Sequence, residues 1–86
     1  MDKKKVLSLI KEFSNNPQGV RFSNLSKVCN FFFGEPRNKS TSHHVYKTPW
    51  QGDPRVNIQN KNGYAKSYQV KQVIKAIEKL EAQNES

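Results

Sequence analysis

Two adjacent histidines lie near the middle of the chain, in the segment Ser42-His43-His44-Val45-Tyr46-Lys47. An imidazole titrates near pH 6.5, so it can accept and return a proton at neutral pH. The segment is rich in strand-forming residues, and successive side chains of a strand point to opposite faces. Two neighbouring histidines therefore cannot flank one bond as an acid–base pair. Chemistry here would use a single histidine with helpers of another type.

His44 is the histidine that best fits this task. Strand alternation places it on one face with Ser42 and Tyr46, whereas Val45 belongs to the other face. Because Val45 is apolar, we expect its face to meet the helices and the face of His44 to be open. The alternative is that His43 and His44 are ordinary sheet residues.

A base such as His44 suits RNA, because RNA carries its own nucleophile, the ribose 2′-hydroxyl. Proton transfer at that oxygen, together with cations near the phosphate, would cleave a strand slowly without a metal. The cations would come from Arg37, Lys39 or Lys47. Tyr46 would stack on a base or orient the imidazole.

Other catalytic patterns are missing from the sequence. It has no glycine-rich phosphate loop, no metal-binding His/Glu spacing and no paired carboxylates, so we expect no cofactor and no metal. Ser42 lacks an evident Asp/His relay. Cys29 lies in an apolar stripe and is interpreted as a buried packing residue. Glu35 and Asp53 each stand beside a proline, where a structural role in a turn is expected.

Charge favours an anionic partner. The 86 residues carry 15 Lys and Arg against 7 Asp and Glu, and residues 21–75 hold ten of the cations but two of the acids. Such a field attracts phosphate backbones and acidic protein surfaces. A basic edge near the end of the chain is either a rail for an RNA backbone, a docking surface for an acidic partner or a solvated face. It consists of Lys61, Lys66, Lys71 and Lys75.

Length and hydropathy limit the class of protein. A chain of 86 residues forms one domain at most. Its single cysteine cannot make an internal disulfide. No apolar run approaches the roughly 20 residues that cross a bilayer, and the apolar start before Lys11 is too short for a signal peptide. We therefore expect a soluble protein of a reducing compartment, the cytoplasm, with no membrane partner.

Three helices and a short sheet must position these residues. The apolar spacing predicts helices over Lys3–Phe13, with Asp2 as its cap, and over Asn24–Phe33, with Ser23 as its cap and Gly34 as its stop. A third helix follows Ser67 as N-cap. Its apolar positions are Val70, Val73, Ile74, Ile77 and Leu80, and residues 83–86 are expected to fray.

Between the second and third helices the apolar period changes to two. This pattern predicts strands at 43–47 and 55–59, a weaker strand at 37–40, a turn at 50–54 and a loop at 60–63. The predicted class is α+β, with the order α-α-β-β-β-α in a single domain over residues 1–86.

The segment Thr41-Ser42-His43-His44-Val45-Tyr46-Lys47 is close to a Gly-Ser-x-His-x-x-Lys pattern, with Thr41 in place of the glycine. It resembles the HicA toxins, which are small bacterial mRNA interferases. Further similarity lies at 20–25, 56–59 and 63–70, and the resemblance covers about residues 20–80. It implies a HicA-like core at 20–82. Residues 2–14 then look like the helical extension of longer members, followed after the core by a tail at 83–86.

The resemblance implies a fold similar to double-stranded-RNA-binding domains, with a three-stranded antiparallel sheet and helices packed on one face. It implies a metal-independent endoribonuclease that cleaves mRNA and is neutralised by a HicB-type antitoxin. His44 takes the position of the catalytic histidine, with Ser42 and Tyr46 in support, while His43 fills a variable position. The expected RNA-binding residues are Arg37, Lys39, Lys47, Lys61, Lys66, Lys71 and Lys75.

Two other functions remain open at this stage. One is a non-catalytic RNA-binding module that uses the basic edge at residues 61–75. The other is an interaction domain for an acidic protein, anchored by Phe31–Phe33 and Trp50.

Overall fold

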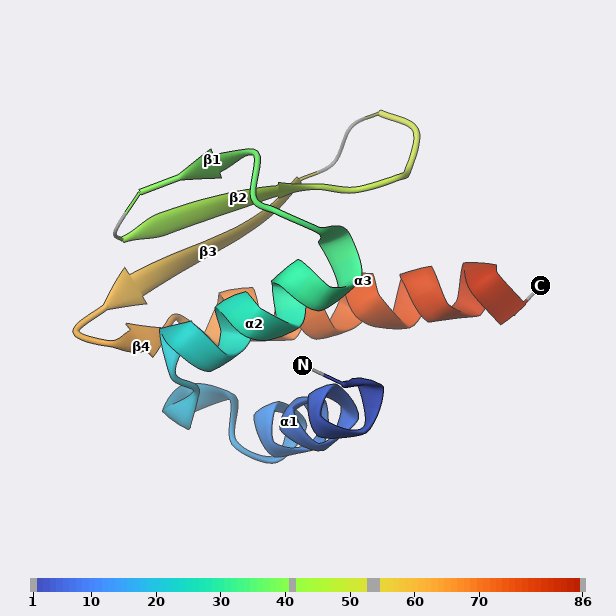
Figure 1. The fold of residues 1–86 in the computed structure, drawn as a ribbon. Helices are drawn as coiled ribbons and strands as arrows, with labels where there is room; N and C mark the ends of the chain where they lie inside the picture. Colours follow the sequence, from blue (N-terminus) through green and yellow to red (C-terminus); the bar gives the residue numbers. More distant parts are fainter. Residues whose placement is uncertain (1, 41, 53–54, 86) are drawn as a thin grey trace.

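The computed structural model describes residues 2–40, 42–52 and 55–85. The chain is an α+β protein with three α-helices and a four-stranded antiparallel sheet in the order β1-β2-β3-β4 (Figure 1). A 3₁₀ turn at Pro17–Gly19 joins the first two helices. The elements are α1 at Lys3–Asn15, α2 at Phe22–Phe33, β1 at Asn38–Lys39, β2 at His43–Lys47, β3 at Arg55–Lys61, β4 at Tyr64–Ala65 and α3 at Ser67–Glu85.

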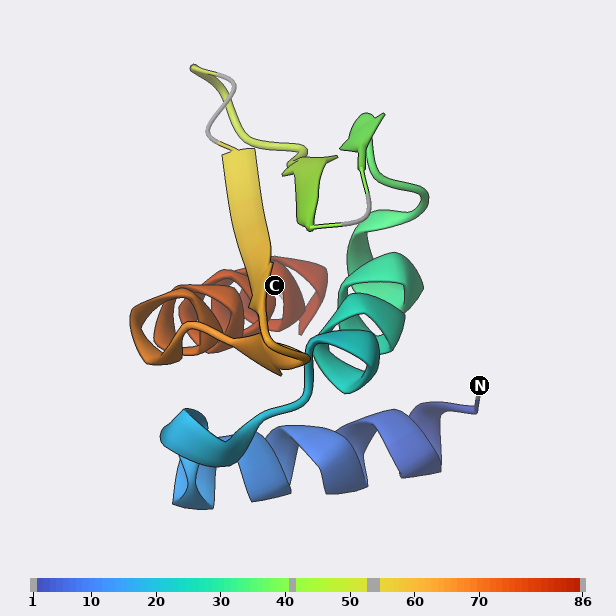
Figure 2. The same cartoon turned by 90° about the vertical axis from the view of Figure 1, so that its left-hand side faces the viewer.

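Helix α1 is an integral part of the fold. Asp2 caps it as predicted, because its Oδ1 accepts a hydrogen bond from the Lys5 backbone N–H at 2.8 Å. Val6 and Phe13 are buried, seven residues apart on one face of the helix. Figures 1 and 2 show α1 below α2 and α3, on the side away from the sheet.

Helix α2 begins earlier than predicted. Its first residue is Phe22 rather than Asn24, and Arg21, not Ser23, occupies the N-cap without a side-chain hydrogen bond. Burial of Phe22 explains the difference, since the packing of its ring favours the two additional helical residues over the better capping residue. The stop at Gly34 is confirmed, with φ at 81° and its N–H bonded to the Asn30 carbonyl.

The sheet has one strand more than predicted. β3 runs to Lys61, and β4 pairs with it through Asn60↔Ala65 and Lys61↔Tyr64. The loop expected at 60–63 is thus the end of a strand plus a tight turn, where Asn62 and Gly63 both have positive φ. Asn-Gly is the dipeptide that such two-residue hairpins favour.

The helices cover one face of the sheet. Figure 2 shows α2 and α3 side by side below β2 and β3, with the opposite face of these strands uncovered. The buried core draws on every helix and on β2, β3 and β4. Its members are Val6, Phe13, Val20, Phe22, Leu25, Val28, Cys29, Tyr46, Val56, Ile58, Ala65, Val70, Val73 and Ile77.

The prediction of which face of β2 is open is wrong. His44 and Tyr46 are buried against the helices, whereas Val45 is half-buried on the opposite face. Two aromatic rings cover more of α2 than one valine can, so burying them is the more favourable choice. The register agrees, because His44 lies opposite Ile58 and Tyr46 opposite Val56.

One expectation about α3 is wrong, because Ser67 is its first residue rather than its cap. The helix extends to Glu85. Trp50 contributes there, because its Nε1–H donates to the Gln83 side chain at 2.7 Å. The strand at 37–40 is confirmed over Asn38–Lys39. Of the turn predicted at 50–54, Asp53 and Pro54 lie outside the described residues.

Candidate active site

His44 lies on β2 at the seam between the sheet and α2. Its ring packs edge-to-face on Phe22, with centroids 4.9 Å apart, and the residue is 7% exposed. On the β1 side its strand partner is Lys39, and on the β3 side it is Ile58. The imidazole is thus enclosed, but it lies beside a cation at the sheet edge.

Hydroxyl groups surround one nitrogen of this ring. His44 Nδ1 is 3.3 Å from the Ser26 hydroxyl oxygen and 3.4 Å from the Tyr46 hydroxyl oxygen. Tyr46 donates its hydrogen to Asn30 Oδ1 at 2.7 Å, the shortest bond of the group. Ser26 and Tyr46 therefore lie against Nδ1, and Asn30 holds the Tyr46 hydroxyl in place, so the hydrogen bond between the ring and the Ser40 backbone falls to the other nitrogen, Nε2.

The surroundings of His44 favour the neutral imidazole. Burial lowers its pKa below the ordinary value of 6.5, and the positive charge of Lys39 lowers the pKa further. The Ser40 backbone carbonyl acts in the opposite direction. The net direction is toward a lower pKa, which favours the uncharged form of the ring.

Tyr46 is placed to orient the His44 imidazole rather than to stack on a base. Its side chain is fully buried, and burial raises the pKa of its phenol to about 12. It is a neutral hydrogen-bonding group at neutral pH. The expectation that Tyr46 stacks on a base is wrong because no face of its ring reaches the surface, while contact with His44 supports the orienting role.

Sequence reasoning missed Ser26 and Asn30. They are one turn apart on α2, in line with Phe22 at the helix start and Phe33 at its end. The sequence signal that could have identified them is their spacing, since Phe22, Ser26 and Asn30 follow one another at intervals of four residues. It marks a polar stripe beside the apolar one, which can meet a polar face of the sheet.

The cations predicted to bind RNA lie on different sides of the molecule. Lys39 is beside His44, and Arg37 donates its backbone N–H to Val45 at the same sheet edge. Lys47 and Lys61 are exposed at the ends of β2 and β3. Lys71 and Lys75 face α1 instead, where they line a hollow with Phe13, Ser14 and Pro17. Lys66 lies just before α3. The structure therefore brings Lys39 to His44 but places Lys71 and Lys75 elsewhere.

Other predicted residues are placed as follows. Ser42 is exposed and its carbonyl accepts from the Asn60 N–H, while His43 is half-buried on the uncovered face. Thr41 lies outside the described residues. Cys29 is fully buried and burial raises the pKa of its thiol, which confirms the packing role. Phe31 is exposed, whereas Phe32 and Phe33 are half-buried beside a hollow at the end of α2.

No group of three or more His, Cys, Asp or Glu side chains within residues 2–40, 42–52 and 55–85 is arranged to hold a metal. None of the helices over that part of the chain combines the length and hydropathy of a membrane span. Comparison with protein-family models, with curated proteins and with solved structures found no match.

Proposed function

We propose that the protein is a metal-independent endoribonuclease, the toxin of a type II toxin–antitoxin system that a HicB-type antitoxin neutralises in the cytoplasm. The sheet with helices on one face would then be a variant of the double-stranded-RNA-binding fold, extended by α1 and β4. One observation carries the proposal. The His44 imidazole has Nδ1 against the hydroxyls of Ser26 and Tyr46 and Lys39 as its neighbour on β1, and burial lowers its pKa.

The network supports a base at Nε2. Tyr46 uses its hydrogen for Asn30, so its oxygen remains an acceptor for an Nδ1–H of His44. A tautomer with Nδ1–H donating to the Tyr46 oxygen would leave the lone pair on Nε2, and the substrate would then have to displace the hydrogen bond between the ring and the Ser40 backbone carbonyl. Nε2 would take the proton of the 2′-hydroxyl as that oxygen attacks the adjacent phosphorus. The bond to the 5′-oxygen breaks, and His44 returns the proton to that oxygen, giving a 2′,3′-cyclic phosphate and a 5′-hydroxyl.

Lys39 would offset the charge that develops on the phosphate. Its Cα lies directly across from that of His44, so the cation and the base share one edge of the sheet. Arg37 lies on the same edge, two residues before Lys39. The antitoxin would block this edge, and an acidic surface on it would complement these cations.

The low exposure of His44 favours a second candidate, a non-catalytic RNA-binding module. In that case the contacts among His44, Ser26 and Tyr46 hold α2 on the sheet, and the exposed cations alone bind RNA. A basic interaction domain for an acidic protein is a third reading, with Phe31 as its exposed anchor.

Cleavage of single-stranded RNA in the presence of EDTA distinguishes the first two. His44→Gln keeps a side chain of similar reach in the buried space, so it should fold, bind RNA and yield no product. His43→Gln is the matched control, because His43 is on the uncovered face away from this network. Product formation by His44→Gln at the native rate would refute the assignment, and the absence of product from the native protein would favour the binding module.

A further inference from the structure

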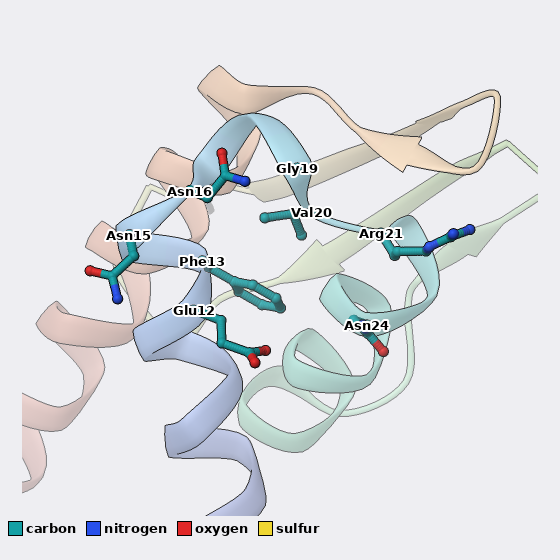
Figure 3. Close-up of a pocket in the computed structure, with 8 residues that line it drawn as sticks. All are labelled: Glu12, Phe13, Asn15, Asn16, Gly19, Val20, Arg21 and Asn24. Carbon is teal, nitrogen blue, oxygen red and sulfur yellow. The ribbon is translucent and has the colours of Figure 1, made fainter.

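A polar cavity lies where α1, the 3₁₀ turn and the start of α2 meet (Figure 3). Its volume is about 360 Å³, which is within the range of small-molecule sites. Figure 3 shows Glu12 reaching from α1 toward the gap between the two helices, with Asn24 across the gap on α2 and the Phe13 ring beside them. The lining residues are Glu12, Phe13, Asn15, Asn16, Gly19, Val20, Arg21 and Asn24.

The Glu12 carboxylate dominates the chemistry of this cavity. It forms no ion pair within the described part of the chain, although Arg21 lines the same cavity. The Arg21 guanidinium is placed over the Tyr64 ring instead, 5.1 Å from its centroid. Glu12 is therefore free to accept two hydrogen bonds from a ligand that presents two adjacent donors.

Asn24 and Phe13 narrow the choice of ligand. The Asn24 carboxamide offers a donor and an acceptor on the wall opposite Glu12. Phe13 and Val20 are nearly fully buried and supply an apolar wall. A flat group with two neighbouring donors and one acceptor along an edge fits this combination.

We infer that this cavity binds an unstacked guanine of single-stranded RNA, an inference that rests on the proposed function. Guanine presents N1–H and N2–H to the Glu12 carboxylate and O6 to Asn24. Adenine and cytosine each place a ring-nitrogen acceptor beside an amino group, and uracil places carbonyl acceptors on both sides of its N–H. Each of these bases would bring an acceptor against the carboxylate. Reading the pairing edge of an unstacked base is the usual mode of single-strand recognition.

The position of the cavity ties it to the candidate active site. Arg21 lines the cavity, and the next residue, Phe22, packs on the His44 ring. A base in the cavity and a ribose at His44 would thus be bound at the same end of α2. Arg21, which lines the cavity with its guanidinium over the exposed Tyr64 ring, would offer a cation to the intervening phosphate.

Binding of 2′-deoxy pentanucleotides, followed by amide NMR of the intact protein, tests the inference. These oligomers lack the 2′-hydroxyl and cannot be cleaved, and they carry a central guanine, adenine, cytosine or thymine between thymines. We expect the guanine oligomer to bind at least about tenfold more tightly than the others, because each of them loses a charge-assisted hydrogen bond. The largest shifts should occur at Glu12, Val20 and Asn24.

Two variants complete the experiment. Glu12→Gln keeps the size of an exposed side chain but offers one acceptor and one donor, so the guanine preference should fall by about tenfold or more. Glu78→Gln makes the same change on α3, in a different hollow, and should leave the preference intact. Equal binding of the four oligomers, shifts elsewhere, or equal behaviour of the two variants would overturn the inference. Guanine preference without RNA cleavage refutes the proposed function alone, and cleavage without guanine preference refutes the inference alone.

Discussion

The hydrogen bond between Tyr46 and Asn30 offers a quantitative test of the site. Tyr46→Phe removes the hydroxyl that donates to Asn30 at 2.7 Å and keeps the buried ring, so no cavity forms. Asn30 is exposed, so water can solvate its freed carbonyl oxygen. The loss should be about 1–3 kcal/mol in the free energy of unfolding, because the substitution removes the bond to Asn30 and also takes the Tyr46 oxygen away from His44 Nδ1. For a domain of this size each 1 kcal/mol lowers Tm by about 4–8 °C.

A double-mutant cycle isolates this bond from the rest of the site. Tyr46→Phe, Asn30→Ala and the double variant are unfolded in urea, and the coupling energy should be about 0.5–1.5 kcal/mol. Tyr64→Phe is the control, because its ring is exposed over Arg21 and the expected change is within about 0.5 kcal/mol. A coupling energy below about 0.3 kcal/mol would refute the network, since that is the usual departure from additivity for independent sites.

Three further predictions concern pH, charge and backbone. Burial lowers the pKa of His44 below 6.5, so the unfolded chain binds a proton on this residue more readily than the folded protein does. The free energy of unfolding should therefore fall as the pH drops below about 6.5. Urea titrations should show this fall in the native protein and a weaker one in His44→Gln. Lys39→Gln removes a charge that lowers the same pKa, so the acid limb of RNA cleavage should move to higher pH, whereas Lys75→Gln, on the side facing α1, should leave it in place. Gly34→Ala should destabilise the fold by about 1–3 kcal/mol from backbone strain alone, because φ is 81° and an added Cβ meets nothing within 4 Å; a loss in thermal unfolding below about 0.5 kcal/mol would contradict this reading.

Local signals predicted most elements of this fold. The Asp2 cap, the Gly34 stop and the strand at 43–47 follow from side chains that act on their own backbone neighbours. The start of α2 and the length of α3 depend instead on distant partners. The contact of Phe22 with His44 and the hydrogen bond of Gln83 with Trp50 stabilise these helical residues, and both form only when distant segments pack together. Such contacts between remote parts of the chain leave no local pattern.

The sequence does contain a signal for β4, the strand that was not predicted, but β4 itself is too short to be recognised. Tyr64 and Ala65 form a strand of two residues, too short to show alternation. The preceding Asn62-Gly63 is a hairpin signature, and it indicates that the chain after it turns back on the chain before it. Treating this dipeptide as a hairpin turn would have predicted a longer β3 and the additional strand β4.

The orientation of β2 determines both which side chains enter the core and which polar groups contact His44. One apolar residue, Val45, suggested which face is buried, yet the aromatic area of His44 and Tyr46 outweighs it, and α2 offers Ser26 and Asn30 as partners for their polar atoms. A strand turned the other way would leave these two polar groups on α2 facing Val45. The cycle on Tyr46 and Asn30 therefore tests more than one bond. A coupling of about 1 kcal/mol requires both side chains on the inner face, which is the arrangement that brings the Tyr46 hydroxyl to His44 Nδ1.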